Sequence, residues 1–324
     1  MVELSSSFSV LFTSLSAKLA LFHSIEKQVC CVSSKIRLIG ADSDPSCDGA
    51  SKINSFQVLP SLKSLSREDL LKFCRKYNIH FIIPSRDGEL GYFAKHRDFL
   101  FKNNIGVMVS EPSTIELCED KLEFSNYLKT DCIAPITTSS KLDNFTSDSK
   151  RFVVKERRGN ASSSLGLNLS KEDASLHARK IENPIFQPFI KGKEFSADAW
   201  MDQNGSCKSL VLRWRVKIVK GESHESVTFS NPEWEQKVKK TLNGIQGLRG
   251  HVMAQVIVDN SYNLHLVEIN PRLGGATPLS LEAGLSSIYW TLSEFINPNA
   301  KIKEISKIKH GMKLLKKDGQ VSIT

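Results

Sequence analysis

Two candidate metal ligands, Glu268 and Asn270, lie two positions apart near the end of an apolar run. In a β-strand alternate side chains point to one face, so this carboxylate and this amide would project together. Oxygen ligands of this kind suit magnesium, which also takes oxygens from the phosphates that it neutralises. Arg272 follows just past the strand end, where it could reach a phosphoryl group in transfer. Together the three residues predict a site for phosphoryl chemistry.

A third candidate ligand, Gln255, belongs to the strand predicted just before. The apolar patterns at 250–258 and 262–270 predict two consecutive strands. Gln255 would share a face with Glu268 if the connection has an even number of residues. With a loop of about six residues, the two side chains would lie directly across from each other.

A plainer interpretation exists for the same segment. Glu268 and Asn270 could be the polar end of an edge strand, and Pro271 with Gly274-Gly275 could form the turn that follows. Gly274-Gly275 would also permit a close approach of the backbone to a ligand. The residues of this segment alone leave both interpretations open.

Lys155 ends a strand predicted at 151–155, and a loop of small residues follows from 157 to 166. Backbone amides in such a loop, around Ser162 and Ser163, can form a nest for phosphates, while Lys155 supplies a point charge. Small-residue hairpin turns are far commoner than phosphate loops, so a simple hairpin remains the alternative.

The apolar stretch 185–190 could supply the slot for an adenine ring. Gln187, Phe189 and Ile190 lie within or at the end of this stretch, and Glu194 follows shortly after. Apolar walls with a few backbone hydrogen bonds suit a nucleotide base, and Glu194 could bind ribose hydroxyls. The alternative is an ordinary hairpin with one acidic residue.

Two arginines, Arg213 and Arg215, share one face of a strand predicted at 209–219. They could hold the carboxylate of a substrate, and the residues 222–224 in a following loop could close over it. Surface arginines with no binding role explain the same pattern equally well.

The elements that would position these residues change character along the chain. Up to about residue 110, short apolar runs alternate with helical segments, which indicates a parallel, doubly wound sheet. No Gly-x-Gly-x-x-Gly follows the first run, which disfavours a dinucleotide site there. From Arg151 onward the pattern indicates antiparallel strands. The predicted strands include 9–13, 36–39 and 80–84, and a predicted helix covers 17–26.

Helix starts are marked by capping residues. Ser66, Ser113 and Asp120 each begin a capping signature, and the last would start a helix from Lys121 to about Lys129. Asn231 followed by proline predicts another helix start. Further predictions are one helix with apolar residues spaced from Leu281 to Phe295, and a solvated helix followed by a hairpin within 301–323.

Composition limits the classes of function. The 324 residues suffice for two or three compact units, and 40% hydrophobic with 24% charged residues is ordinary for a globular protein. No run of apolar residues is long enough to span a bilayer, which disfavours a membrane protein. The net charge of +9 is scattered apart from a basic tail at 301–317, so an anionic small substrate is favoured over nucleic acid.

Seven cysteines without a Cys-x-x-Cys motif fit neither a disulfide framework nor a zinc site. They indicate a reducing compartment, and we expect a cytoplasmic location. The segment 5–22 resembles a secretory signal, but Glu3 replaces a basic start and Lys18 breaks the apolar run. A first strand and helix explain this segment better.

Taken together and in this order, the motifs resemble the ATP-grasp superfamily, most of all the carbamoyl-phosphate-synthase large-subunit branch, over about residues 8–295. The most specific match is Val-Glu-Ile-Asn-Pro-Arg-Leu-Gly-Gly at 267–275, and Asp87-Gly-Glu-Leu90 resembles a motif of the leading domain. The resemblance implies a mixed α/β and α+β architecture. It comprises an N-terminal doubly wound parallel pre-ATP-grasp domain at 1–112, an ATP-grasp domain at 113–297 and a basic tail at 298–324.

Within that ATP-grasp domain the resemblance implies two α+β subdomains that enclose the nucleotide, with a lid at about 134–190. It also implies a role for each candidate residue. The nucleotide would be bound by Lys121, Lys155, Ser162, Ser163, Gln187, Phe189, Ile190 and Glu194, Mg²⁺ or Mn²⁺ by Gln255, Glu268 and Asn270, and phosphate by Arg272.

The chemistry implied by the resemblance joins a small carboxylic acid to an amine. A carboxylate attacks the γ-phosphoryl group of ATP, and the amine captures the resulting acyl phosphate, with Lys155 and Arg272 neutralising charge. The serines after Lys155 replace glycines of many relatives, and only one ATP-grasp unit is present, without a glutaminase domain. Alternatives are a phosphotransfer of the carbamoyl-phosphate-synthase type and a non-catalytic nucleotide-binding regulator. The two substrates cannot be named, and a homodimer is one assembly left open.

Overall fold

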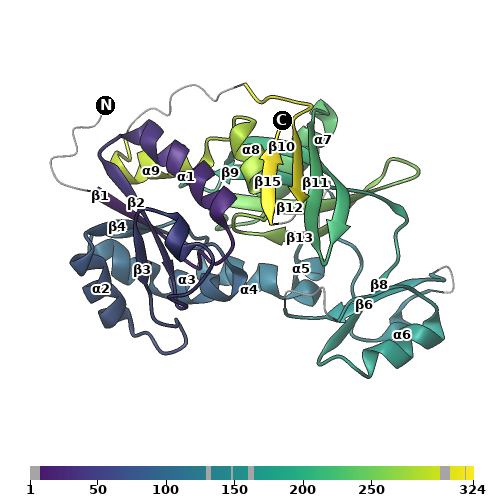
Figure 1. The fold of residues 1–324 in the computed structure, drawn as a ribbon. Coiled ribbons are helices and arrows are strands. Elements are labelled where there is room, and N and C mark those ends of the chain that lie inside the picture. The colour runs from purple at the N-terminus through teal and green to yellow at the C-terminus, as the bar shows by residue number, and fades with distance from the viewer. Residues whose placement is uncertain (1–7, 129–132, 147–148, 160–163, 300–306, 318) are drawn as a thin grey trace.

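The computed structural model describes residues 8–128, 133–146, 149–159, 164–299, 307–317 and 319–324 (Figure 1). Three sheets, of five, seven and three strands, organise these residues. In the described ranges no helix is long and apolar enough to cross a membrane. The six cysteines among them are free thiols.

The five-stranded sheet is parallel throughout, in the order β3-β2-β1-β4-β5. Its strands are apolar on both faces because helices cover both, as is usual for parallel sheets. Residues such as Val10 pack toward α1 and α9 (Ser287–Ile296), whereas the neighbouring Leu11 packs toward α2 and α3. The predicted doubly wound sheet is therefore confirmed. Its elements are β1 (Phe8–Phe12), α1 (Leu19–Val32), β2 (Ile36–Asp42), η1 (Ala50–Lys52), β3 (Phe56–Val58), α2 (Arg67–Lys76), β4 (Ile79–Ile83), α3 (Asp87–Lys102) and β5 (Gly106–Val107).

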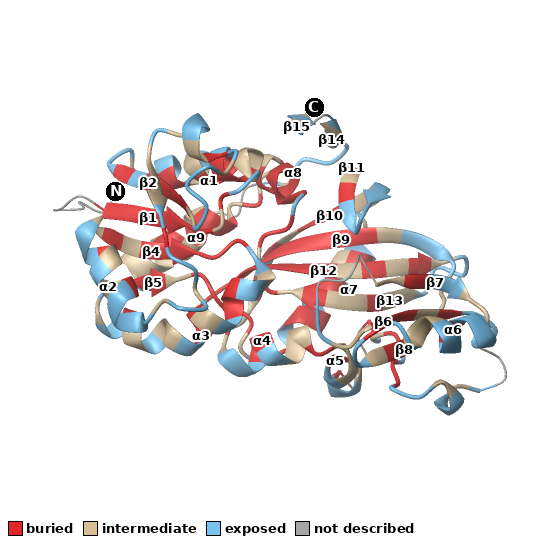
Figure 2. Ribbon diagram, turned by 60° about the horizontal axis from the view of Figure 1, so that its bottom comes forward, coloured by how far each residue is buried: buried red, intermediate tan, exposed pale blue. Residues whose placement is uncertain are grey.

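The seven-stranded sheet is antiparallel and has the order β13-β12-β9-β10-β11-β14-β15. One face is apolar: Phe195 and Ala197 of β9 pack in a large core with Trp234 and Val238 of α7. The alternate residues of β9, such as Glu194 and Ser196, must therefore face the other way. Figure 2 shows buried residues running through β9 and β12. The strands are β9 (Gly192–Met201), β10 (Cys207–Val219), β11 (Glu222–Phe229), β12 (Gly250–Asp259), β13 (Leu264–Asn270), β14 (Lys313–Lys317) and β15 (Gln320–Ile323), and α7 is Pro232–Asn243.

The three-stranded sheet forms a separate lobe with α6, at the lower right of Figure 1. Its small core joins Phe152 and Val154 of the central strand to Ala174 of the helix. A bridge between Pro135 and Leu266 ties the entry to this lobe to the seven-stranded sheet. The lobe and the connecting helices comprise α4 (Pro112–Glu119), α5 (Lys121–Tyr127), η2 (Leu142–Asn144), β6 (Phe152–Glu156), β7 (Gly166–Leu169), α6 (Lys171–Ala178) and β8 (Pro184–Pro188).

Several predicted boundaries are confirmed by capping contacts. Ser66 accepts a hydrogen bond from the Asp69 amide, Asp120 from the Leu122 and Glu123 amides, and Asn231 from the Trp234 amide. The prediction for Ser113 was wrong: α4 starts at Pro112, and its N-cap Glu111 makes no side-chain capping bond. Proline is favoured at the first helical position by its fixed φ, and the Thr114 and Ile115 amides donate to the Glu111 carbonyl, so this start forms without a side-chain cap.

Two other predictions were wrong. The single helix predicted from Leu281 to Phe295 is broken into α8 (Thr277–Glu282) and α9 (Ser287–Ile296), with Gly284 between them at φ +114°. The residues 222–224 lie at the start of β11, not in a loop, because Lys220 and Gly221 turn the chain in two residues with positive φ. The predicted hairpin is present as β14 and β15, but residues 300–306 of the predicted basic helix lie outside the described ranges.

Candidate active site

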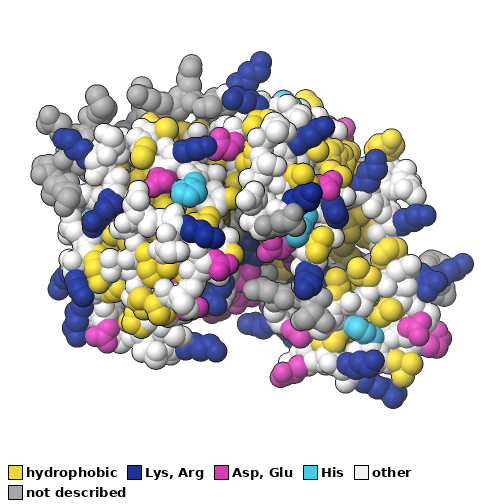
Figure 3. All heavy atoms as spheres, viewed as in Figure 1, with side chains coloured by type: hydrophobic (Ala, Val, Ile, Leu, Met, Phe, Trp, Pro, Cys, Tyr) yellow, Lys and Arg dark blue, Asp and Glu magenta, His cyan; other side chains and the backbone are white. Residues whose placement is uncertain are grey.

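A cleft of about 930 Å³ separates the three-stranded lobe from the polar face of the seven-stranded sheet. Figure 3 shows the molecule hollowed where this lobe meets the rest. The walls come from both of these sheets and from the start of α3, so the N-terminal unit reaches the cavity through a helix and not through its sheet.

The candidate metal ligands lie together on one wall of the cleft. Gln255 of β12 is the register partner of Glu268 of β13, and Met253 is the partner of Asn270. The five residues between Val258 and its partner Leu264 are an odd number, so this pairing depends on a register shift between Gln255 and Val256 and not on the even connection that was expected. The Asn270 amide donates to the Glu268 carboxylate at 2.8 Å. In the described ranges no group of three His, Cys, Asp or Glu residues could hold a metal ion. One carboxylate and two amide oxygens nevertheless fit magnesium, because phosphate oxygens would supply the remaining negative charge.

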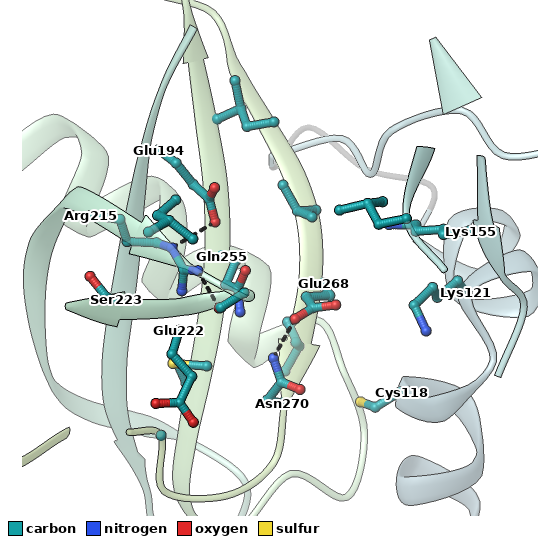
Figure 4. A pocket seen from close by; sticks show the side chains of 18 of the residues that line it. Cys118, Lys121, Lys155, Glu194, Arg215, Glu222, Ser223, Gln255, Glu268 and Asn270 are labelled. Carbon is teal, nitrogen blue, oxygen red and sulfur yellow. Dashed lines mark hydrogen bonds and ion pairs between the residues drawn. The ribbon is translucent and has the colours of Figure 1, made fainter. Parts of the chain in front are cut away.

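Two lysines face this wall from the opposite side, as Figure 4 shows. Lys155 of β6 is buried and lines the cleft, and Lys121 at the start of α5 lines it as well. Burial lowers the pKa of the Lys155 ammonium to about 8, although the Glu268 carboxylate opposes that shift. Lys121 donates to the Gly159 carbonyl at 2.9 Å. The arrangement gives the cleft a cationic wall across from an oxygen-rich one.

The end of the cleft next to the lobe is apolar. Gln187 of β8 is buried and donates to the Thr138 hydroxyl at 2.8 Å, and Phe189 and Ile190 line the cleft just beyond this strand. Apolar side chains from both walls complete this end: Ile136, Val153, Leu167, Ile257 and Val267. Ser162 and Ser163, the predicted phosphate-loop residues, lie outside the described ranges.

Glu194 and Arg215 are paired with each other, with the Arg215 Nε atom 3.0 Å from the carboxylate of Glu194. Burial raises the pKa of the Glu194 carboxyl despite the nearby arginine, and burial lowers the pKa of the Arg215 guanidinium. Arg215 also donates to the Gly221 carbonyl at 2.7 Å. Both side chains line the cleft, where this pair places opposite charges next to each other.

Arg272 is held at the cleft by Asp87 at the start of α3. Two nitrogens of the guanidinium contact the two carboxylate oxygens, one of them at 2.6 Å. This bidentate pair joins the N-terminal unit to the segment after β13, 185 positions later in the chain. The sequence motif that contains Asp87 did not predict this contact.

The comparison with protein families agrees with the fold. Residues 118–276 match a family model described as an ATP-grasp domain.

Residues 118–276 have the ATP-grasp fold.

Solved structures extend the similarity to nearly the whole chain. The first is a biotin carboxylase from Campylobacter jejuni in complex with a nucleotide, with a TM-score of 0.72, 12% identity and coverage of 94% of this chain and 74% of that one. An L-amino acid ligase from Bacillus licheniformis has a TM-score of 0.70 and 14% identity over 94% and 78% of the two chains. An N5-carboxyaminoimidazole synthetase from Staphylococcus aureus has a TM-score of 0.66 and 14% identity, with coverage of 95% of this chain and 81% of that one. These likenesses show the ATP-grasp fold alone, and no curated protein matches the sequence.

The ATP-grasp cleft thus gathers most of the residues singled out from the sequence. Of the fourteen, the two serines, Ser162 and Ser163, lie outside the described ranges. The other twelve all line the cleft: Lys121, Lys155, Gln187, Phe189, Ile190, Glu194, Arg213, Arg215, Gln255, Glu268, Asn270 and Arg272.

Sequence reasoning missed the acidic residues that pair with the cleft arginines. Asp198 is buried on β9 and contacts Arg213 at 2.8 Å, and Asp87 contacts Arg272. Strand alternation could have found Asp198, because it shares a face with Glu194. Asp87 left no comparable signal, because its partner is remote in sequence.

Proposed function

We propose that this chain is an ATP- and magnesium-dependent ligase that joins a small carboxylic acid to an amine or ammonia. The observation that carries the proposal is one cleft with Gln255, Glu268 and Asn270 on one wall and Lys121 and Lys155 on the other. Hard oxygen ligands opposite cations suit a magnesium-bound triphosphate. The ATP-grasp domain supports the nucleotide half of this proposal.

The apolar end of the cleft would hold the adenine ring, beside Gln187, Phe189 and Ile190. Glu194 would serve the ribose hydroxyls after release from Arg215. The phosphates would then lie between Lys155 and Glu268, with Ser162 and Ser163 as further candidates for phosphate contacts. Magnesium, held by Gln255, Glu268 and Asn270, would neutralise phosphate oxygens.

The reaction would proceed in two transfers. A carboxylate oxygen of the acid attacks the γ-phosphorus of ATP, and the bond to the bridging oxygen breaks to release ADP. The amine nitrogen then attacks the acyl carbon, phosphate leaves, and the nitrogen loses a proton. Lys155 and Arg272 would act as catalytic residues by balancing the charge that develops on the transferred group.

The acid substrate would bind beyond the phosphates, near Arg213 and Arg215. Arg215 is already paired with Glu194, whereas the Nη1 atom of Arg213 has no partner in the described part of the chain. Of the two arginines, Arg213 is therefore the better candidate for a substrate carboxylate.

The test is an ATP-consumption screen over pairs of small acids and amines, with mass spectrometry of the product. We expect one amide and one ADP per turnover. Glu268→Ala should lower kcat/KM about 100-fold or more, because it removes the only carboxylate among the metal ligands. Glu225→Ala, in the same sheet but away from the cleft, is the control and should retain activity. A Glu268→Ala enzyme with wild-type turnover would sink the proposal.

Two other functions remain candidates. The first is phosphotransfer of the carbamoyl-phosphate-synthase type, in which a phosphorylated intermediate is itself the product or is phosphorylated again. It is favoured by the segment 267–275 and by the combination of two amides with one carboxylate as candidate metal ligands. Product analysis separates this from a ligase, because no amide would form. Binding of ATP without turnover over the whole screen would instead indicate a nucleotide-binding regulatory protein.

A further inference from the structure

A cluster of buried polar side chains lies behind the wall of the cleft, and the proposed chemistry gives a role only to its arginine, Arg213. Its centre is the carboxylate of Asp198, which is fully buried on β9. One oxygen accepts from Arg213 Nε at 2.8 Å and from the Ser280 hydroxyl at 2.5 Å. The other lies 3.3 Å from His251 Nε2 and from the Thr277 hydroxyl. These five residues are called the Asp198 cluster below.

The Asp198 cluster joins elements that do not follow one another in sequence. Arg213 lies on β10, His251 on β12, and Thr277 and Ser280 on α8. A single carboxylate therefore fixes two strands of the cleft wall and the start of a helix relative to β9. This arrangement suits a group that sets positions more than a group that reacts, because the carboxylate is fully buried, both of its oxygens are hydrogen-bonded, and it does not line the cleft.

The helix in question follows directly on a turn that lines the cleft. Gly274 and Gly275 both line it, and the Gly274 amide donates to the Thr277 hydroxyl at 2.7 Å. A Cβ atom on Gly274 would lie 2.8 Å from the sulfur of Met253, so the turn packs tightly against that residue. The Arg213 Nη2 atom contacts the same sulfur at 3.2 Å. The turn and the guanidinium are thus held against one side chain.

The charges explain why Asp198 is needed here. Arg213 is almost wholly buried, and a buried cation requires an opposite charge nearby. Burial alone would raise the pKa of the Asp198 carboxyl, but Arg213 and His251 hold that pKa well below its usual range. Asp198 is therefore ionised at neutral pH. Its charge balances Arg213 through Nε and leaves Nη1 without a partner among the described residues.

We propose that Asp198 is a positioning residue, which holds Arg213 and the Gly274-Gly275 turn together so that Arg213 Nη1 receives a carboxylate oxygen of the acid substrate. This inference rests on the proposed function for the identity of the ligand as a carboxylate. It assigns Arg213, and not Arg215, as the anchor of that carboxylate.

The test uses acetate as the carboxylate probe and saturation-transfer NMR as the readout, with and without magnesium AMP-PNP. Wild-type protein should give an acetate signal. Arg213→Met should weaken acetate binding about tenfold, the effect expected for loss of one charge-assisted hydrogen bond. Asp198→Asn should weaken it to a similar extent, while the affinity for magnesium AMP-PNP changes less than about twofold.

Asp202→Asn is the matched control. Asp202 is also a buried aspartate, just past the end of β9, and pairs with Lys208 at 3.1 Å, but it does not line the cleft. Its variant should bind acetate as the wild type does.

A double variant separates positioning from a general loss of structure. If Asp198 acts through Arg213, then Asp198→Asn should have no further effect on acetate binding in an Arg213→Met protein. Additive effects would overturn the proposal, and so would a wild-type protein without an acetate signal. If Asp198→Asn does not fold, Arg213→Met still tests the anchor on which the proposal depends: a tenfold loss supports Arg213 as that anchor, and unchanged binding overturns the proposal.

The two proposals fail in different ways. If the wild-type protein does not bind nucleotide, the proposed function is refuted. The acetate titration without nucleotide would still show whether Arg213 binds a carboxylate. If nucleotide binding is intact but the Asp198→Asn and Arg213→Met variants bind acetate as the wild type does, only this inference is refuted.

Discussion

Lys155 carries a consequence of burial that can be measured. With its pKa lowered to about 8 by burial, the free protein loses the Lys155 proton as pH rises through 8. Bound phosphates would restore a higher pKa, so nucleotide binding takes up a proton between about pH 8 and the normal lysine range. Affinity for magnesium ATP should therefore fall as pH rises above 8.

This prediction is checked by calorimetry in buffers of different ionisation enthalpy. Lys155→Met should bind magnesium ATP more weakly and lose both the proton uptake and the fall in affinity above pH 8. Lys171→Met, on the exposed surface of the same lobe, should leave both unchanged. Persistence of the uptake in Lys155→Met would show that another group is responsible.

At the residue scale, the sequence predicted ligands better than it predicted partners. Strand alternation placed Glu268 and Asn270 on one face, which is a local property, whereas the direct pairing of Gln255 with Glu268 also needs a register shift next to Gln255 that the sequence did not indicate. The pairs Arg213–Asp198 and Arg215–Glu194 depend on which strands become neighbours in the sheet. Strand order is set by the whole fold, so the sequence could not show that these arginines have partners.

At the element scale, the misprediction between α8 and α9 has a local physical cause. Apolar spacing continues through Leu281, Leu285 and Ile288, and all three side chains are indeed buried. The spacing of these apolar residues therefore predicted correctly which side chains are buried. It did not predict that Gly284 takes a positive φ, which ends the helix. A glycine among evenly spaced apolar residues gives no sign of which conformation it adopts.

Gly192, at the start of β9, is required by close packing. A Cβ atom there would lie 2.1 Å from the Val258 carbonyl oxygen of β12, and backbone atoms cannot easily move away. Gly192→Ala should lower the free energy of unfolding by about 2 kcal/mol or more, in line with other overpacked sites. Urea denaturation followed by circular dichroism measures this change.

The control for this substitution is Gly91→Ala within α3. A Cβ atom on Gly91 meets nothing within 4 Å, and alanine is the better helix former. Gly91→Ala should therefore stabilise the protein by up to about 1 kcal/mol. Equal effects of the two substitutions would contradict the packing argument.

At the scale of the whole molecule, the three-stranded lobe is tied to the rest near Asp120. The Asp120 carboxylate caps α5 and pairs with Arg157 and Arg158, just past β6, at 2.8 and 2.9 Å. Burial would raise the pKa of Asp120, but hydrogen bonds from Arg157 and the Glu123 amide hold it at about 2. The pairs therefore persist throughout the neutral range.

These pairs should influence how fast the lobe opens. The arginines are partly exposed, so salt should weaken their attraction to Asp120. Asp120→Asn should speed release of a fluorescent ADP analogue about two- to fivefold in stopped-flow experiments, and higher salt should speed release from the wild type. Asp143→Asn removes an exposed pair elsewhere on the lobe and serves as the control. Release rates indifferent to both salt and Asp120 would contradict this prediction.

The division of the cleft between two bodies has a further consequence if the proposed function holds. Lys155 belongs to the lobe, whereas Glu268 and Asn270 belong to the seven-stranded sheet. An outward swing of the lobe would separate Lys155 from Glu268 and Asn270, so that these residues no longer surrounded the same phosphates. ATP bound to the open protein is then protected from wasteful hydrolysis, and cleavage waits for the closed form, in which water is excluded and the acid is in place.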